Sequence, residues 1–282
     1  MLITAVAILV NPLAGKGTSS HLAKWLGKQL KDKQIHFSIF KNNWPDHFND
    51  YSDIWITGGD GSINYFINRF PDCKIPLTLY KTGTGNDFAW KLYGDLSNHQ
   101  IFKKSFESAP KPVDAGKCNN TLFINSFGIG FDGDIIQSMN AIRFLGGPIG
   151  YMIAVLLKIF SYREAHYKIS CGNENWDDRF LLVIINNSSR AGGGFKITPT
   201  AEIVDGKLNM LLCKKLNLLQ RLRYLPVLKK GKHLHLPFVI HRLGKSFSIH
   251  ADKILSIQVD GELIKAQTLE IEVLPAQFIF RY

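Results

Sequence analysis

The sequence predicts an α/β domain followed by a β-rich domain, and three observations support this prediction. Up to residue 115, short apolar runs alternate with stretches of helical periodicity, which is typical of βα units and a mostly parallel sheet. Glycine-rich turns follow two of the apolar runs. After Asp114, strand-like runs separated by turn dipeptides replace this alternation and indicate a sandwich-like domain.

We expect the boundary between the two domains near residue 115. A chain of 282 residues is long enough for two domains of ordinary size. The α/β domain is expected at 1–115 and the β-rich domain at 116–276. The final apolar run, 277–282, can complete either of them.

Apolar periodicity predicts the elements of the first domain. Leu22, Trp25, Leu26 and Leu30 recur at helical spacing, whereas the strand-like runs are continuously apolar, as in buried parallel strands. The predicted strands are 3–10, 35–40, 53–57 and 75–80, and the predicted helices are 21–31 and 62–70.

Turn dipeptides such as Asp205-Gly206 and Asp260-Gly261 divide the second domain into strand-like runs. Two longer stretches between these runs have a helical pattern instead. The predicted strands are 121–127, 167–171, 180–186, 207–213, 246–251, 254–259 and 268–275, and the predicted helices are 135–162 and 216–230.

The composition is that of a globular protein in a reducing compartment. Hydrophobic residues make up 45% of the chain and charged residues 20%, which argues against a largely disordered protein. The four cysteines form no C-x-x-C pair, so neither a zinc site nor a disulfide framework is indicated. The N-terminus lacks the basic start of a signal peptide, and the longest apolar run, at 147–160, is shorter than the ~20 residues that span a bilayer. We expect a cytoplasmic protein.

The net charge of +11 is concentrated in one part of the chain. Between Gly206 and Ala251 there is no Asp or Glu but ten Lys and Arg residues. Such a segment is either a solvated face or a surface that attracts a polyanion, nucleic acid or anionic lipid headgroups. Few aromatic residues are interleaved with the cations, and no nucleic-acid motif is recognised, so we expect no nucleic-acid partner.

The strongest local motif is ITGGDGSIN, residues 56–64, where three glycines surround Asp60 between a strand and a helix. Glycines let the backbone approach a ligand closely, and the amides and helix N-terminus that follow favour a phosphate. A carboxylate in this loop would repel a phosphate unless Mg²⁺ lay between them. An ordinary Asp-Gly turn is the alternative interpretation.

Two further loops belong to the same pattern. In KTGTGNDFAW, residues 81–90, a second glycine loop precedes Asn86 and Asp87, which are placed to cap the next helix. VNPLAGKG, residues 10–17, follows the first strand and offers Asn11. Because the carboxyl ends of neighbouring parallel strands share one edge of the sheet, we expect these loops to face one crevice.

Two familiar nucleotide motifs are excluded. The loop at 10–17 is no Walker A motif, because Gly17 follows the lysine where Ser or Thr is required. GIGFDG, residues 128–133, matches a dinucleotide fingerprint. However, no Asp or Glu occurs from Ile135 to Arg163, where the ribose-binding acid is expected.

Taken in order, the motifs resemble the diacylglycerol kinase catalytic-domain family, which includes bacterial lipid kinases and sphingosine kinases. The resemblance covers nearly the whole chain, and its first loop is shared with the NAD kinases. The motifs that carry it are TGGDGSIN, KTGTGNDFAW, VDAG, GIGFDG and QVDGE. The sequence departs from the family pattern at Ser62, where Thr is usual, and at Lys81, where an apolar residue or Pro is commoner.

The resemblance implies an ATP site in the first domain and a cleft between the two domains for catalysis. Within it, Thr84 is implied to lie close to the nucleotide. The residues expected to bind the nucleotide are Asn11, Gly58, Gly59, Asp60, Gly61, Ser62, Asn64, Thr84, Asn86 and Asp87.

The resemblance also implies the catalytic and metal-binding residues. Asp260 is implied to be the base that takes the proton from the lipid hydroxyl, with Glu262 nearby. Asp60, Asp87 and Asp114 are implied to surround a catalytic Mg²⁺. A second, structural Mg²⁺ is implied in PTAEIVDGK, residues 199–207, where the expected ligands are Glu202, Asp205 and Lys207.

We therefore expect a Mg²⁺- and ATP-dependent kinase that phosphorylates a lipid hydroxyl, with a diacylglycerol-like acceptor, and that contacts an anionic membrane peripherally. A sphingoid-base kinase and an NAD kinase are the alternative enzymes. A nucleotide-regulated nucleic-acid-binding protein is the alternative from another class. The identity of the lipid and the oligomeric state, a homodimer included, stay open.

Overall fold

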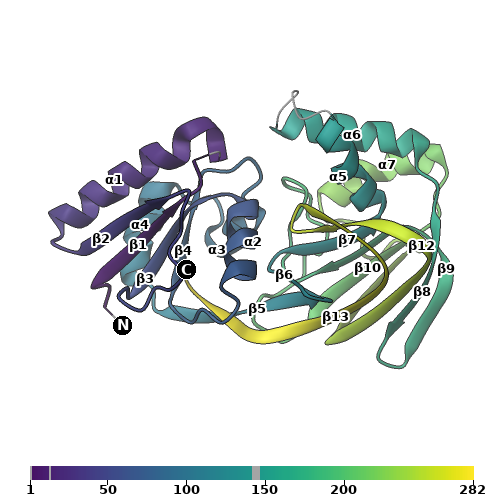
Figure 1. The fold of residues 1–282 in the computed structure, drawn as a ribbon. Coiled ribbons are helices and arrows are strands. Elements are labelled where there is room, and N and C mark those ends of the chain that lie inside the picture. Colours follow the sequence, from purple (N-terminus) through teal and green to yellow (C-terminus); the bar gives the residue numbers. More distant parts are fainter. Residues whose placement is uncertain (1, 13, 142–146) are drawn as a thin grey trace. The chain divides into compact units, whose positions relative to one another are not determined.

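The computed structural model describes residues 2–12, 14–141 and 147–282 (Figure 1). Two compact units are present. The first consists of Met1–Val113 together with Ala276–Tyr282, and the second consists of Asp114–Pro275. Each unit has its own group of paired strands, and β13 belongs to both groups, so each unit is described by itself.

A parallel sheet forms the centre of the first unit. Its strand order is β13-β4-β3-β1-β2, and neighbouring strands in it run parallel to one another. The core strands are almost wholly apolar and inaccessible to solvent, as expected for a sheet with both faces covered. The strands are β1 (Ala5–Val10), β2 (His36–Lys41), β3 (Asp53–Gly58), β4 (Leu77–Lys81) and the end of β13 (Glu262–Arg281).

The helices of the first unit connect these strands. The helix α1 buries Ala23, Leu26 and Leu30, which recur on one face. The helix α4 was not predicted, although Ser97 and Gln100 form a capping box at its start, a signal visible in the sequence. The helical elements are η1 (Ala14–Gly17), α1 (Thr18–Asp32), α2 (Asp60–Arg69), α3 (Asp87–Tyr93) and α4 (Asn98–Glu107).

The second unit is built around antiparallel strands in the order β11-β10-β9-β7-β12-β13. β8 pairs with both β9 and β12, and β5 pairs with β13 and β6. The strands that begin here are β5 (Pro110–Cys118), β6 (Thr121–Phe123), β7 (Ser126–Gly130), β8 (Ala165–Cys171), β9 (Glu174–Asn186), β10 (Leu208–Lys214), β11 (Val239–Gly244) and β12 (Ser246–Val259).

Three helices, α5 (Phe131–Ala141), α6 (Gly147–Ser161) and α7 (Leu218–Lys229), lie together on this unit (Figure 1). Phe127, Phe247 and Ile257 belong to the main apolar core between the strands. A second apolar cluster, including Leu182 and Leu211, lies under α7. The second unit therefore has a separate apolar layer beneath its helices.

The predicted fold class, α/β followed by a β-rich sandwich-like domain, is confirmed. The predicted strands 246–251 and 254–259 are one strand, β12, whose pairing with β13 shifts between His250 and Leu255. The predicted helix 135–162 corresponds to α5 and α6, and its residues 142–146 lie outside the described residues.

Candidate functional site

The first glycine loop joins β3 to α2. Gly58 lies directly against Ser62, because a Cβ added to Gly58 would be 2.2 Å from the Ser62 Oγ atom. The Asn11 side-chain amide donates a 2.9 Å hydrogen bond to the same hydroxyl. The backbone N–H of Asn11 donates to the Thr57 carbonyl. Asn11 and Ser62, predicted from separate motifs, are thus in contact.

The first and second glycine loops touch through their backbones. A Cβ added to Gly83 would lie 2.4 Å from the Gly59 Cα atom, so neither position has room for a side chain. The Asn86 side chain fixes the second loop by accepting from the Gly83 N–H at 2.9 Å and donating to the Gly83 carbonyl at 2.7 Å. Close backbone approach of this kind is the structural reason for glycine in both loops.

Asp60 links the two loops electrostatically. Its two carboxylate oxygens each accept a 3.1 Å hydrogen bond, one from the Asp87 N–H and one from the Phe88 N–H. Asp60 therefore caps α3 from a neighbouring loop. The predicted side-chain cap by Asn86 is wrong, because that side chain is turned back to Gly83. Burial raises the pKa of the Asp60 carboxyl, and the backbone N–H donors Phe88 and Asp87 oppose this shift.

The third loop, after β1, packs on the other two. A Cβ added to Gly15 would lie 2.2 Å from the Thr82 carbonyl oxygen. The Ser19 hydroxyl donates to the Thr57 carbonyl at 2.5 Å and lies 3.2 Å from the Thr82 hydroxyl. The three predicted loops therefore meet in one place at the carboxyl ends of β1, β3 and β4, where parallel sheets bind ligands.

Other predicted nucleotide residues differ in exposure. Asn64 is buried in α2, whereas Thr84 is exposed on the second loop. A Cβ added to Gly61 would meet nothing within 4 Å, so the first turn of α2 is open beside the joined loops. A backbone cradle of this type, with a helix N-terminus and no side chain in the way, suits a phosphate chain.

The acidic residues do not form a metal cage. Among residues 2–12, 14–141 and 147–282, no three His, Cys, Asp or Glu side chains are grouped to hold a metal ion. Asp60 and Asp87 belong to the first unit and Asp114 to the second. Within the first unit, Asp60 and Asp87 could supply carboxylate oxygens to a Mg²⁺ that arrives with a nucleotide and takes most of its ligands from phosphate and water.

In the second unit, the backbone surrounds the Asp260 carboxylate. Its Oδ2 atom accepts from the Ile124 N–H at 2.7 Å, and its Oδ1 atom accepts from the N–H groups of Asn125 and Ser126 at 3.0 and 2.8 Å. Asp260 and Gly261 both have positive φ, as a two-residue hairpin turn between β12 and β13 requires. The hairpin thus presents Asp260 in one fixed orientation, and Glu262 beside it is exposed.

Asp114 holds the segment predicted as a second metal site. Its Oδ2 atom accepts a 2.7 Å hydrogen bond from the Gly206 N–H, and its own N–H donates to the Ile203 carbonyl. Asp205 accepts from the Lys207 N–H at 3.0 Å, as in an Asx turn. The three residues expected to bind this metal are all exposed: Glu202, Asp205 and Lys207. The metal role of these three residues stays a prediction.

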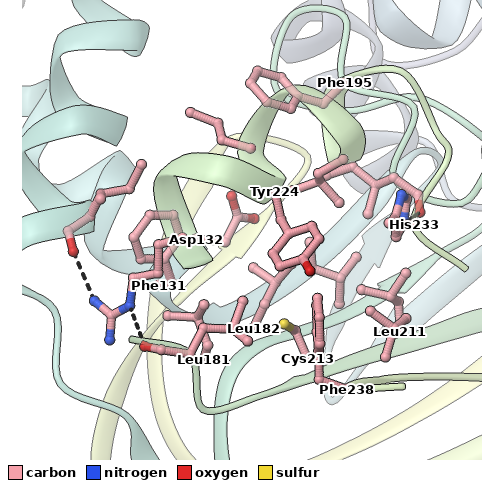
Figure 2. A pocket seen from close by; sticks show the side chains of 18 of the residues that line it. Phe131, Asp132, Leu181, Leu182, Phe195, Leu211, Cys213, Tyr224, His233 and Phe238 are labelled. Atoms are coloured by element: carbon pink, nitrogen blue, oxygen red, sulfur yellow. Dashed lines mark hydrogen bonds between the residues drawn. The ribbon is translucent and has the colours of Figure 1, made fainter. Parts of the chain in front are cut away.

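An apolar pocket of about 90 Å³ lies between the strands and helices of the second unit (Figure 2). Leu182 of β9 and Leu211 of β10 line one side, and Tyr224 and Leu225 of α7 line the other. Engineered apolar cavities of roughly 150 Å³ accept a benzene-sized molecule. The pocket therefore suits a short stretch of one alkyl chain.

Asp132 is the acidic residue among the pocket-lining side chains (Figure 2). Burial raises the pKa of its carboxyl to about 6, and a hydrogen bond to Gln258 opposes the rise. Gln258 also donates to the Ser126 hydroxyl at 2.7 Å and accepts from the Gly261 N–H at 2.7 Å. Asp132 is thereby connected to the turn that carries Asp260.

Sequence reasoning missed Asp132, although it lies within GIGFDG, the motif that matches a dinucleotide fingerprint. The structure gives the glycines of this motif other roles. A Cβ added to Gly128 would lie 2.3 Å from the Asp132 Oδ2 atom, and one added to Gly133 would lie 2.0 Å from the Ser256 carbonyl oxygen. The carboxylate inside the glycine motif was the available signal.

Two family models match the chain. Residues 5–118 match the diacylglycerol kinase catalytic domain, and residues 125–280 match the YegS C-terminal NAD kinase beta sandwich-like domain. A diacylglycerol kinase of Mycobacterium tuberculosis is 26% identical, with 96% of this chain and 93% of that protein covered. A diacylglycerol kinase of Staphylococcus haemolyticus is 26% identical over 76% of this chain and 66% of that protein.

Solved structures share the fold. A crystal structure of a diacylglycerol kinase from Bacillus anthracis superimposes with a TM-score of 0.75 at 22% identity, and the match covers 100% of this chain and 98% of that one. An NAD kinase from Archaeoglobus fulgidus, solved in complex with ATP, superimposes with a TM-score of 0.59 at 12% identity, and the match covers 99% of this chain and 94% of that one.

Among the described residues, no helix is both long and apolar enough to cross a membrane.

Proposed function

The chain belongs to the bacterial diacylglycerol and lipid kinase family, whose members are phosphotransferases, and we propose that it transfers the γ-phosphate of ATP to a hydroxyl of a diacylglycerol-like lipid. The apolar pocket of the second unit, with Asp132 on its lining, is the observation that carries the choice of a lipid acceptor. The three joined glycine loops support the choice of a nucleotide donor.

In this proposal the first unit binds ATP. The backbone N–H groups at the start of α2 and in the second loop bind the phosphates, because no side chain fills the space beside Gly61. Thr84 and Asn86 lie on the adjoining loop. Asp60 and Asp87 would hold a Mg²⁺ bound with the nucleotide, and the ion would supply charge neutralisation for the transferred phosphoryl group.

The second unit binds the acceptor. One alkyl chain enters the pocket between α7 and the strands β9 and β10, and its burial contributes about 0.8 kcal/mol per CH₂ group. Asp132 accepts a hydrogen bond from a polar group of the glycerol moiety. Gln258 connects Asp132 on the pocket lining with the turn at Gly261, next to Asp260.

Asp260 acts as the general base. Its carboxylate takes the proton of the lipid hydroxyl while the hydroxyl oxygen forms a bond to the γ-phosphorus and ADP leaves. Three backbone N–H groups hold the Asp260 carboxylate in position, and none of these donors belongs to a mobile side chain. Glu262, the first residue of β13, is the neighbouring acidic group.

A lipid acceptor lies in a membrane. We therefore extend the proposal to a cytoplasmic protein that contacts anionic lipids at the membrane surface peripherally. The acid-free segment from Gly206 to Ala251 carries ten Lys and Arg residues. Each cation held near an anionic bilayer contributes about 1 kcal/mol, over a Debye length of about 8 Å at physiological salt.

The pocket assignment is tested with diacylglycerols of increasing chain length. The value of kcat/KM should rise with length for the wild type until the pocket is full. Leu228→Trp, which narrows the pocket from α7, should lower kcat/KM for long chains at least tenfold and leave a short-chain acceptor nearly unaffected. Leu243→Trp, at an exposed position of β11 outside the pocket, is the matched control. Equal kcat/KM at all lengths, in the wild type and both variants, would contradict the acceptor site.

A further inference from the structure

The helices α6 and α7 each expose large apolar side chains. Leu219 is 79% exposed and Phe160 64% exposed, values that are high for residues of this size. We call this set the α6–α7 apolar surface, and its members are Leu156, Leu157 and Phe160 of α6 and Leu218, Leu219 and Leu222 of α7.

In a helix of this basic segment, leucines are expected to pack inward and cations to face outward, but Leu219 and Leu222 are exposed and the Arg221 side chain is nearly buried. Arg221 points to α6, where it donates to the carbonyls of Ile159 and Tyr162 at 2.8 and 3.0 Å. Its guanidinium also pairs with the nearly buried Glu164 at 2.6 Å. With this arginine turned inward, Leu218, Leu219 and Leu222 are directed outward, whereas Leu225 and Leu228 face the pocket.

These bonds hold α6 and α7 together, and the two helices are in contact. The inner sides of both helices line the apolar pocket, through Val155 and Ile159 of α6 and Leu225 of α7. The same two helices therefore have one apolar side over the pocket and a second apolar side facing outward. A surface helix of a globular protein usually has only the first of these.

Exposed cations are interspersed with the outward leucines of α7. Arg223 and Lys230 lie on the same side of the helix as Leu219, given 3.6 residues per turn, and both are exposed. Lys214 and Lys215 precede α7 and are exposed as well. The sequence from Gly206 to Ala251 itself contains no acidic residue. Apolar residues mixed with Lys and Arg, without acids, match the headgroup region of an anionic bilayer.

We infer that the α6–α7 apolar surface inserts into the interface of an anionic bilayer. Phe160 and Leu219 enter the region between headgroups and acyl chains, while Arg223 and Lys230 contact lipid phosphates. The inference rests on the proposed lipid kinase function, since the inserted helices also cover the pocket that would take the lipid. It differs from purely electrostatic recruitment because part of the binding should survive high salt.

Sedimentation of the full chain with vesicles tests this inference without ATP. With vesicles of phosphatidylglycerol and phosphatidylcholine, the double variant Phe160→Ser, Leu219→Ser should partition at least about tenfold more weakly than the wild type. The charge variant Arg223→Glu, Lys230→Glu should lose binding at low salt. Wild-type binding should weaken but persist in ~0.5 M salt, where the Debye length is only a few Å.

A matched control uses exposed apolar residues of the same unit outside this surface. Leu243→Ser, Ile254→Ser should bind vesicles like the wild type. Equal partition of the wild type and the Phe160/Leu219 variant, or equal loss in the control, overturns the inference. The inference is also overturned if the wild type does not bind vesicles and is oligomeric, while the Phe160/Leu219 variant is monomeric. The surface would then be an interface between copies of the chain.

Activity on a short-chain diacylglycerol in solution separates this inference from the proposed function. The Phe160/Leu219 variant should retain wild-type turnover on the soluble acceptor and lose turnover on vesicles. If the wild type inserts into vesicles but phosphorylates no lipid, the proposed function fails while the insertion stands. If soluble acceptor is phosphorylated and the variant works equally well on vesicles, the insertion fails alone.

Discussion

At the scale of single residues, the amides around Asp260 determine how a catalytic role can be tested. Asn is often treated as a neutral copy of Asp. Here, however, three N–H groups point at the carboxylate, and an Asn NH₂ group would face donors that need an acceptor. Any loss of activity in Asp260→Asn must therefore be compared with its loss of stability.

Asp260→Asn should lower kcat by at least about 10²-fold, the usual contribution of a general base, while the Kd for ATP changes little. The same variant should lose about 1–3 kcal/mol of unfolding free energy, because a buried donor is left unsatisfied. Urea unfolding, ATP titration and steady-state kinetics on one preparation provide the three values. Glu262→Gln is the control for stability, as Glu262 is exposed. A stably folded Asp260→Asn enzyme with near wild-type kcat would contradict the base assignment.

Asp132 gives a prediction for the pH dependence of stability. Its pKa in the folded chain is about 6, raised by burial above the usual 3.8. The folded state thus keeps a proton that the unfolded state releases between about pH 4 and 6, so this group lowers stability as pH rises through that window.

Asp132→Asn should therefore have a higher Tm than the wild type above pH 6 and a similar Tm near pH 4. Its kcat/KM for lipid should fall, because the proposed contact with the acceptor is altered. Thermal unfolding from pH 4 to 8, compared with Asp178→Asn at an exposed position of β9, isolates the effect. A Tm difference that does not change with pH would mean that Asp132 titrates normally.

Sequence reasoning at this scale identified glycine positions better than side-chain partners. Gly59 and Gly83 were recognised because clusters of glycines between a strand and a helix are uncommon in ordinary turns. The cap of α3 was assigned to Asn86 and Asp87 from proximity in sequence, whereas the carboxylate that supplies it, Asp60, lies in another loop. Such long-range partners depend on how the strands are ordered, which local sequence does not state.

At the scale of elements, the contact between the first and second glycine loops should be sensitive to one methyl group. Gly83→Ala places a Cβ 2.4 Å from the Gly59 Cα atom, so the loops must separate. We expect a loss of about 1–3 kcal/mol in stability together with weaker ATP binding. Calorimetric unfolding and nucleotide titration measure the two effects.

Gly61→Ala is the matched control and is itself informative. Its Cβ meets nothing within 4 Å, and Ala favours a helix over Gly, so stability should be unchanged or higher by up to ~1 kcal/mol. If phosphates occupy the open space beside α2, ATP affinity should nevertheless fall. Unchanged ATP affinity in Gly61→Ala would place the phosphates elsewhere.

The strands of the first unit were the easiest elements to predict, because buried parallel strands are continuously apolar. In the second unit, β12 was predicted as two strands, since polar residues 252–253 interrupt the pattern at the point where its pairing with β13 shifts. β11 was missed because Val239 to Gly244 includes His241 and Arg242 and lacks clear alternation. A strand's neighbours, rather than its own residues, decide such cases.

At the scale of the whole molecule, the C-terminal residues complete the N-terminal unit. Phe280 of β13 pairs with Leu77 of β4, and the Arg281 guanidinium forms an ion pair with Asp53 in which both groups are almost wholly buried. Arg281 also donates to the Ser108 carbonyl at 3.0 Å. The first unit therefore contains two separate stretches of the chain, Met1–Val113 and Ala276–Tyr282.

Arg281→Leu should destabilise the first unit by about 3–5 kcal/mol, because Asp53 is left buried without its partner. The loss should be larger at pH 8 than at pH 5, since burial already raises the pKa of Asp53 and the arginine that opposes this is gone. The double variant Asp53→Asn, Arg281→Leu should recover part of the loss. Denaturant unfolding at both pH values is the measurement, and equal stability of wild type and Arg281→Leu would contradict it.

The order of motifs along the whole chain predicted the family and the fold class, because the glycine loops and the late D-G-E turn are separated by the expected kinds of elements. The apolar pocket could not be predicted in the same way. Its apolar lining residues come from α5, β9, β10, α6, α7 and the segment around Phe238, and each of these apolar residues alone looks like an ordinary core residue.

The most direct test of the proposed kinase activity is the identity of the phosphorylated product. ATP labelled on the γ-phosphate should be incubated with Mg²⁺ and the full chain, in mixed micelles that offer a diacylglycerol, a sphingoid base or no lipid, and with NAD as a soluble acceptor. We predict label on the diacylglycerol hydroxyl, strongly reduced in Asp260→Asn. Label on NAD, or ATP hydrolysis with no lipid labelled, would contradict the proposal.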